Sequence, residues 1–128
     1  MNKIFLLMLL LFCINVYGQL DFSGDWYWTE NDDDNTFNIT LTKVNDSFYK
    51  GTHCGVFAGG MKMDCVDGDE PSLSATLQGD SLIVTFTSQF CLKKGKAVIK
   101  FSNDSIIWKI IKEPDGEYYL PDEAILRK

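Results

Sequence analysis

The sequence predicts an all-β fold, a single antiparallel up-and-down β-barrel of about eight strands. Apolar and polar residues alternate along a series of short segments, as they do in strands that have one buried and one exposed face. Stretches rich in Gly, Asn, Asp and Pro separate these segments and are typical of turns. No part of the chain after residue 18 repeats apolar residues at helical spacing. Consecutive hairpins favour a barrel because closure removes the exposed sheet edges.

The first 18 residues have the pattern of a signal peptide and are excluded from the predicted fold. Lys3 precedes an apolar run over residues 4–14, which is shorter than the roughly 20 residues of a membrane span. We expect cleavage between Gly18 and Gln19, which leaves residues 19–128 as one domain. The expected location is the periplasm or the extracellular space. Lipoprotein anchoring through Cys13 is not expected, because a lipoprotein has a small residue where Phe12 stands.

The chain carries a formal net charge of −6. An acidic surface argues against nucleic acid as a partner. No second long apolar run follows the leader, so we expect no membrane span.

The element around which the fold is organised is a hairpin over residues 48–65. Gly59 and Gly60 suit a two-residue primed turn, because positive φ angles cost glycine nothing. That turn places Cys54 opposite Cys65, and directly opposed strand residues are within disulfide reach. The turn and the cysteine spacing thus support one register, and we predict a Cys54–Cys65 disulfide. Export permits such a bond.

The remaining strands follow from alternation and turn residues. Before the hairpin, strands are expected over residues 20–30 and 36–44, separated by a polar loop. After it, strands are expected over residues 72–77, 81–88, 96–101 and 105–112. A last short strand is expected over 117–120, and residues 121–128 are expected to form a half-buried tail or one helical turn.

The opening of the predicted domain resembles a known family. Gly24, Trp26 and Tyr27, followed one strand later by Gly51 and Thr52, resemble the opening motif of the avidins. The same Gly-x-Trp start is similar to that of lipocalins and other small calycin barrels. This resemblance implies a calycin-like (lipocalin- or avidin-like) barrel of the kind found in small exported proteins of unassigned function.

The biotin-binding residues of the avidins do not carry over to this chain. His53 stands where that family has a tyrosine, and Gly55 stands where it has a serine. Biotin is therefore not expected as a ligand.

His53, the only histidine of the chain, is the strongest candidate for chemistry. The hairpin register places it diagonally across from Asp64, on the face opposite the disulfide, as half of a conceivable acid–base pair. No nucleophile motif or paired catalytic carboxylates accompany it, so we expect no enzyme and assign no catalytic residue.

No metal and no cofactor are expected either. One histidine and two cysteines expected in a bridge do not supply a zinc site. Asp32, Asp33 and Asp34 are interpreted as a solvated loop rather than a calcium site. Cys91 is left single; a buried, a reactive and an intermolecularly bonded thiol are the alternatives, and we expect it to be buried and inert.

Two functions remain. In the first, Trp26, Trp28, His53 and Trp108 contact a small apolar ligand held in the barrel mouth. In the second, the tryptophans fill the interior, no ligand is held, and the outer surface binds another protein, as an inhibitor or immunity-type module does.

Overall fold

A computed structural model describes residues 20–28 and 34–128. The predicted signal peptide and Asp32 and Asp33 lie outside these described residues. The described chain is all-β, with strands β1 (Gly24–Trp28), β2 (Thr36–Asn45), β3 (Phe48–Phe57), β4 (Lys62–Cys65), β5 (Leu73–Gln78), β6 (Ser81–Thr87), β7 (Lys94–Ser102), β8 (Ser105–Lys112) and β9 (Glu123–Arg127), and one short 3₁₀ turn, η1 (Ala58–Gly60).

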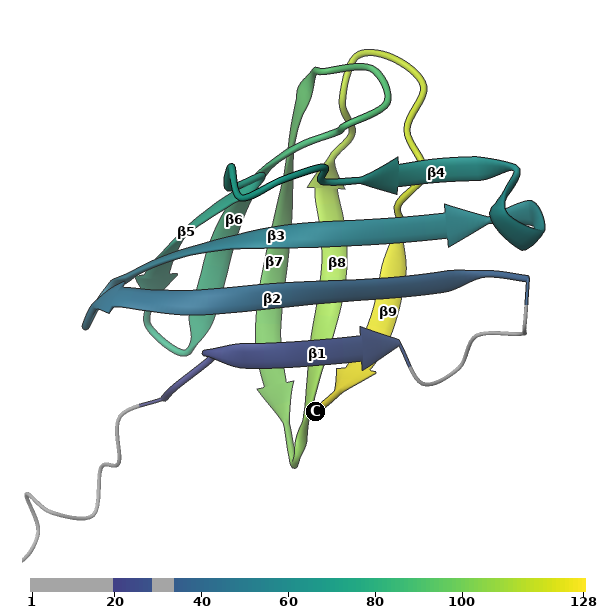
Figure 1. Cartoon of the computed structure of the whole chain (residues 1–128). Helices are drawn as coiled ribbons and strands as arrows, with labels where there is room; N and C mark the ends of the chain where they lie inside the picture. Colours follow the sequence, from purple (N-terminus) through teal and green to yellow (C-terminus); the bar gives the residue numbers. More distant parts are fainter. Residues whose placement is uncertain (1–19, 29–33) are drawn as a thin grey trace, which may run out of the picture.

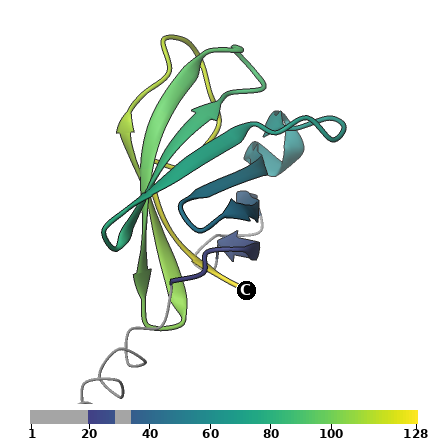
Figure 2. The ribbon, with the colours of Figure 1, turned by 90° about the vertical axis from the view of Figure 1, so that its left-hand side faces the viewer.

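Eight of these strands close into a ring, which confirms the predicted all-β antiparallel barrel of about eight strands. The sheet runs in the order β2-β1-β9-β8-β7-β6-β5-β3-β4, and a further pairing of β2 with β3 closes the ring. Figure 1 shows β1 to β4 stacked in front and crossing β6 to β9 at a steep angle. The side view in Figure 2 shows these two groups of strands as the two walls of a flattened barrel.

β4 departs from a simple up-and-down order. β3 pairs with β5 over Phe48–Gly51 and with β4 over Cys54–Phe57. β4 therefore extends the front wall beyond the barrel, and β5 takes the place beside β3 that the ring requires. The change of partner occurs where the backbone of Ser72 reaches β3, since the Ser72 N–H donates to the Gly51 carbonyl over 2.9 Å.

The C-terminal segment was predicted wrongly. Residues 117–120, expected as the last strand, form an irregular crossing segment, and the tail expected after them contains β9. β9 pairs with β8 and with β1 and so completes the ring. The physical reason is the alternation of Ala124 and Leu126, whose side chains are buried in the core. Five residues of alternation were too few to be distinguished from a tail.

The central hairpin has the predicted register. Cys54 lies opposite Cys65, and the two form a disulfide. Gly59 and Gly60 have φ angles of 64° and 97°, as a primed turn requires. The sequence therefore determined this hairpin through two independent local signals.

Aromatic side chains fill the barrel interior. The Trp108 ring lies 5.2 Å from Phe37 and 5.6 Å from Phe86, measured between ring centroids. Toward the other end, Phe22 stacks on Phe101 at 4.4 Å. The indole N–H of Trp108 donates to the Pro121 carbonyl, so its polar atom is satisfied. The interior is a packed core.

No helix among the described residues is long and apolar enough to cross a bilayer.

Removing the disulfide tests the hairpin. Replacing Cys54 and Cys65 together by alanine is expected to lower the free energy of unfolding by about 3 kcal/mol, because the bridge closes a short loop in the unfolded chain. Urea unfolding of the oxidised protein measures the loss, and Cys91→Ser is the control that should change little. A peptide map without reductant that joins Cys91 to either hairpin cysteine would contradict the assignment.

Candidate functional site

The candidate site is a buried polar cluster at one end of the barrel, formed by His53, Asp64, Ser72 and Ser88. These residues come from β3, from β4, from the segment before β5 and from the segment after β6. All four are buried; His53 is 2% exposed and Asp64 is 0% exposed. Such a group inside an otherwise apolar barrel is stable only if every polar atom has a partner.

Strand alternation brings the two central members together. Tyr49, Gly51 and His53 are buried on β3 and face the interior, while Cys54 belongs to the outer face with the disulfide. Asp64 is paired with Gly55 and lies diagonally across from His53. Gly55 has no side chain, which leaves room for the backbone of Tyr119 to cross β3 at this point. The predicted proximity of His53 and Asp64 is confirmed.

Asp64 joins four segments of the chain through its carboxylate. One oxygen accepts from His53 Nε2 at 2.8 Å and from the Gln89 N–H at 2.6 Å. The other accepts from Ser88 Oγ at 2.6 Å and from the Tyr119 N–H at 3.2 Å. The carboxylate therefore ties β4 to β3 and to the two loops that cover this end of the barrel.

These hydrogen bonds determine the charge state of Asp64. Burial opposes ionisation, but hydrogen bonds from His53, Ser88 and the Gln89 N–H outweigh it and hold the pKa of the carboxyl below its ordinary value of 3.8. An ionised carboxylate only accepts, so His53 Nε2 carries a proton. His53 Nδ1 lies 2.7 Å from Ser72 Oγ, and in a neutral ring it accepts from that hydroxyl.

The order Asp64–His53–Ser72 is that of a nucleophile-activating relay. Ser72 is only 4% exposed and its hydroxyl is engaged by the enclosed His53 ring. In this conformation the relay offers no surface to a substrate. Its physical effect is to hold β3, β4 and the segment before β5 together.

The tryptophans predicted to contact a ligand lie in different environments. Trp26 and Trp108 are buried in the core, and Trp28 is half-buried with its ring 6.4 Å from Phe57. Trp108 and His53 both face the interior, but each is already in contact with protein groups.

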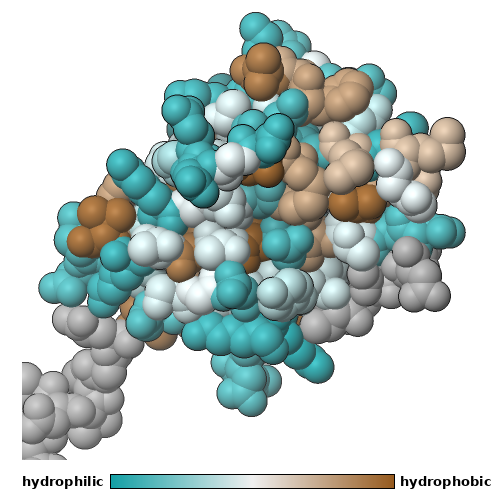
Figure 3. Space-filling view, in the orientation of Figure 1, coloured by the Kyte–Doolittle hydropathy of each residue, from teal (hydrophilic) through white to brown (hydrophobic). Residues whose placement is uncertain are grey.

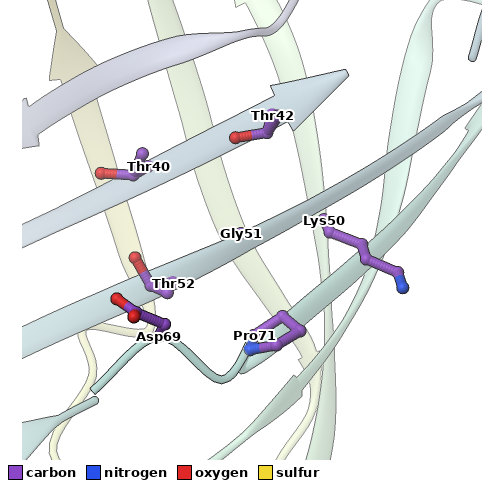
Figure 4. A pocket seen from close by; sticks show the side chains of 7 residues that line it. All are labelled: Thr40, Thr42, Lys50, Gly51, Thr52, Asp69 and Pro71. Atoms are coloured by element: carbon purple, nitrogen blue, oxygen red, sulfur yellow. The ribbon is translucent and has the colours of Figure 1, made fainter. Parts of the chain in front are cut away.

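A hollow of about 370 Å³ lies on the outer wall (Figure 4). Thr40, Thr42 and Thr52 line it from β2 and β3, with Lys50 and Asp69 at its sides (Figure 4). A second hollow of about 330 Å³ lies between β7 and β8, also on the outside. Neither opens into the barrel mouth where the apolar ligand was expected.

Large apolar side chains are exposed at the same end as the polar cluster. We call them the apolar rim and define it as Met61, Met63, Phe90 and Leu92. Met61 is 88% and Met63 52% exposed, on and beside β4, and the other two lie in the loop after β6. Figure 3 shows hydrophobic surface gathered over β4 and the loops above it. The Gln89–Asp64 hydrogen bond connects that loop to β4.

Three further sequence predictions concern Cys91, metal binding and the acidic loop. Cys91 is free, as predicted, but it is half-buried rather than buried, and its side chain lies against Gly116. Among the described residues no group of three or more His, Cys, Asp or Glu side chains could hold a metal ion. The interpretation of the loop at Asp32 and Asp33 falls outside the described residues.

Ser72 and Ser88 were not identified from the sequence. They stand at the first and the last position of two expected strands, over residues 72–77 and 81–88, and alternation gives a serine at a strand end no special role. The available signal was the buried pairing of His53 with Asp64, since a histidine and a carboxylate inside a barrel leave further hydrogen-bonding positions to be satisfied.

Comparison of the chain with protein-family models, with curated proteins and with solved structures finds no match.

Asp64→Asn tests the cluster. The amide keeps the shape but loses the charge, and its NH₂ group faces a donor where an oxygen accepted before. We expect the free energy of unfolding to fall by about 3 kcal/mol, as when one partner of a buried charged network is removed. Asp104→Asn, at an exposed turn, is the matched control and should change stability by less than about 0.5 kcal/mol. Equal effects of the two changes would contradict the role given to Asp64.

The lowered pKa of Asp64 predicts a pH dependence. A carboxyl with a lower pKa in the folded state contributes stability above its unfolded value near 3.8 and loses it as the pH falls through the folded pKa. Below about pH 4 the native protein should therefore lose stability more steeply than Asp64→Asn, by up to about 1.4 kcal/mol per pH unit. Urea unfolding across this range measures both slopes, and parallel slopes would count against an ionised Asp64.

Proposed function

We propose that this protein is an exported interaction module that binds another protein through the outer surface of a filled β-barrel. The observation that carries the proposal is the contrast between interior and exterior. Inside the ring, Trp108 packs against Phe37 and Phe86, while Met61 and Met63 are exposed outside it. Exposed apolar side chains gathered at one end are typical of a protein-binding surface.

The barrel mouth supports the same choice. A small apolar ligand held near His53 would need space beside apolar groups. His53 and Asp64 there form hydrogen bonds with each other and with Ser72, Ser88 and backbone N–H groups. These contacts favour a protein partner over a ligand in the mouth.

Export supports a partner outside the cytoplasm. The basic start and short apolar run of the first 18 residues predict a leader. The Cys54–Cys65 disulfide in the structure suits an oxidising compartment. The acidic net charge favours a basic partner surface and argues against nucleic acid.

The proposal is tested by site-specific photo-crosslinking in the native host. A benzophenone amino acid is placed in turn at exposed apolar positions around the barrel, namely Tyr27, Met61, Leu92 and Ile111. We expect one or two neighbouring positions to crosslink a defined polypeptide, with the others as internal controls. Native mass spectrometry of the purified protein gives the opposing outcome, since a retained small molecule without any crosslinked polypeptide would favour ligand carriage.

A further inference from the structure

β4 is the unpaired edge of an otherwise closed sheet. Among the described strands it pairs with β3 alone and stands at the end of the strand order, whereas β2 is joined back to β3. In Figure 1 β4 lies at the upper border of the front wall, with no strand beyond it. An open strand edge presents backbone N–H and C=O groups to which a further strand can be added.

The register identifies which groups face outward. The Val66 N–H donates to the His53 carbonyl over 3.1 Å, which makes that position a hydrogen-bonded pair. Hydrogen-bonded and non-hydrogen-bonded pairs alternate in an antiparallel ladder, so Asp64 also bonds to β3. Met63 and Cys65 then direct their backbone groups away from β3. Within residues 34–128 no hydrogen bond joins these groups to another strand or loop.

The edge is held rigidly from both faces. On the outer face the disulfide ties Cys65 to β3. On the inner face the Asp64 carboxylate is fixed by His53 and by the N–H of Gln89. A strand that is already ordered loses little conformational entropy when a partner pairs with it.

The side chains around the edge define the chemistry of the partner. Met61 and Met63 expose apolar surface along the strand. Beyond its C-terminal end, Asp67, Asp69 and Glu70 are exposed in the loop that leads to β5. Lys62 does not offset this charge along the edge, because its Nζ lies over the Tyr119 ring at 5.5 Å from the centroid.

We propose that the β4 edge binds an extended segment of another protein by antiparallel strand addition, with basic residues at the N-terminal end of that segment followed by alternating apolar side chains. The basic residues lie beside Asp67, Asp69 and Glu70, and the apolar ones lie beside Met63. Backbone hydrogen bonds to Met63 and Cys65 supply the affinity, and the flanking side chains supply the selectivity. This inference rests on the proposed function, and it specifies the surface that binds the partner and the way in which the partner binds.

The test uses the oxidised protein and a fluorescent synthetic peptide, Lys-Arg-Val-Thr-Val-Thr-Val. Two analogues are N-methylated, one at every valine and the other at every threonine. Only one of these alternating sets can face β4, so one analogue should bind at least about tenfold more weakly while the other stays close to the parent peptide. The protein is unchanged in this comparison, which separates binding from folding. No measurable binding of the parent peptide, or equal binding of both analogues, would overturn the inference.

A matched pair of variants tests the same edge from the protein side. Met63→Pro removes an N–H that makes no bond to β3 and is compatible with an edge strand. Met63→Thr keeps that N–H and changes only the side chain. We expect the proline variant to lose about tenfold in peptide affinity and the threonine variant to lose clearly less. A disulfide peptide map confirms that both are folded, and equal affinities would contradict backbone pairing.

Amide exchange gives a direct readout. In the free protein the N–H groups of Met63 and Cys65 should exchange fast and that of Asp64 slowly, and the peptide should protect the first two. If the exchange rates do not alternate in this way, β4 is not an open edge. If a partner crosslinks at Ile111 and the peptide protects neither N–H, the proposed function stands and only strand addition at β4 is wrong. If sedimentation shows dimers of the native protein and Met63→Pro abolishes them, the occupant of the edge is a second copy of this chain and not a segment of another protein.

Discussion

The arrangement of this end of the barrel depends on one buried carboxylate. Asp64 accepts hydrogen bonds from His53 on β3, from Ser88 and the Gln89 N–H in the loop after β6, and from the Tyr119 N–H in the segment before β9. A buried charge is tolerated only with such a full set of donors. Because these donors belong to three segments outside β4, the cost of leaving the carboxylate unsatisfied couples β3, β4 and both covering loops. The cluster thereby specifies how β4 and the loops sit on the barrel.

The sequence predicts the parts of the fold that local rules control. The Gly59-Gly60 turn and the spacing of Cys54 from Cys65 both lie within one hairpin, and their register is confirmed. Period-two alternation likewise identified the buried faces of β2 and β6, for example Phe37 and Phe86. These signals need no knowledge of distant residues.

Non-local pairing is the part that the sequence did not reveal. β3 exchanges β4 for β5 near Gly51, and nothing in the composition of that strand specifies which neighbour each half receives. β9 was missed because five residues carry too little alternation to predict a strand, and its pairing with β1 joins opposite ends of the chain. Ser72 and Ser88 became recognisable only once the fold had placed them around His53 and Asp64.

The position of β4 explains why an open edge persists on a barrel that could have avoided one. Eight strands already close the ring through the β2–β3 pairing, so β4 is not needed for closure. Proteins usually protect an edge strand with a proline, a bulge or an outward lysine. β4 has no proline and no bulge, and its Lys62 turns toward Tyr119. Its shortness alone limits non-specific pairing. A disulfide and a buried carboxylate nevertheless fix these four residues in place. Rigid attachment of a strand that closure does not require is physically reasonable if the strand's free edge is the part that is used.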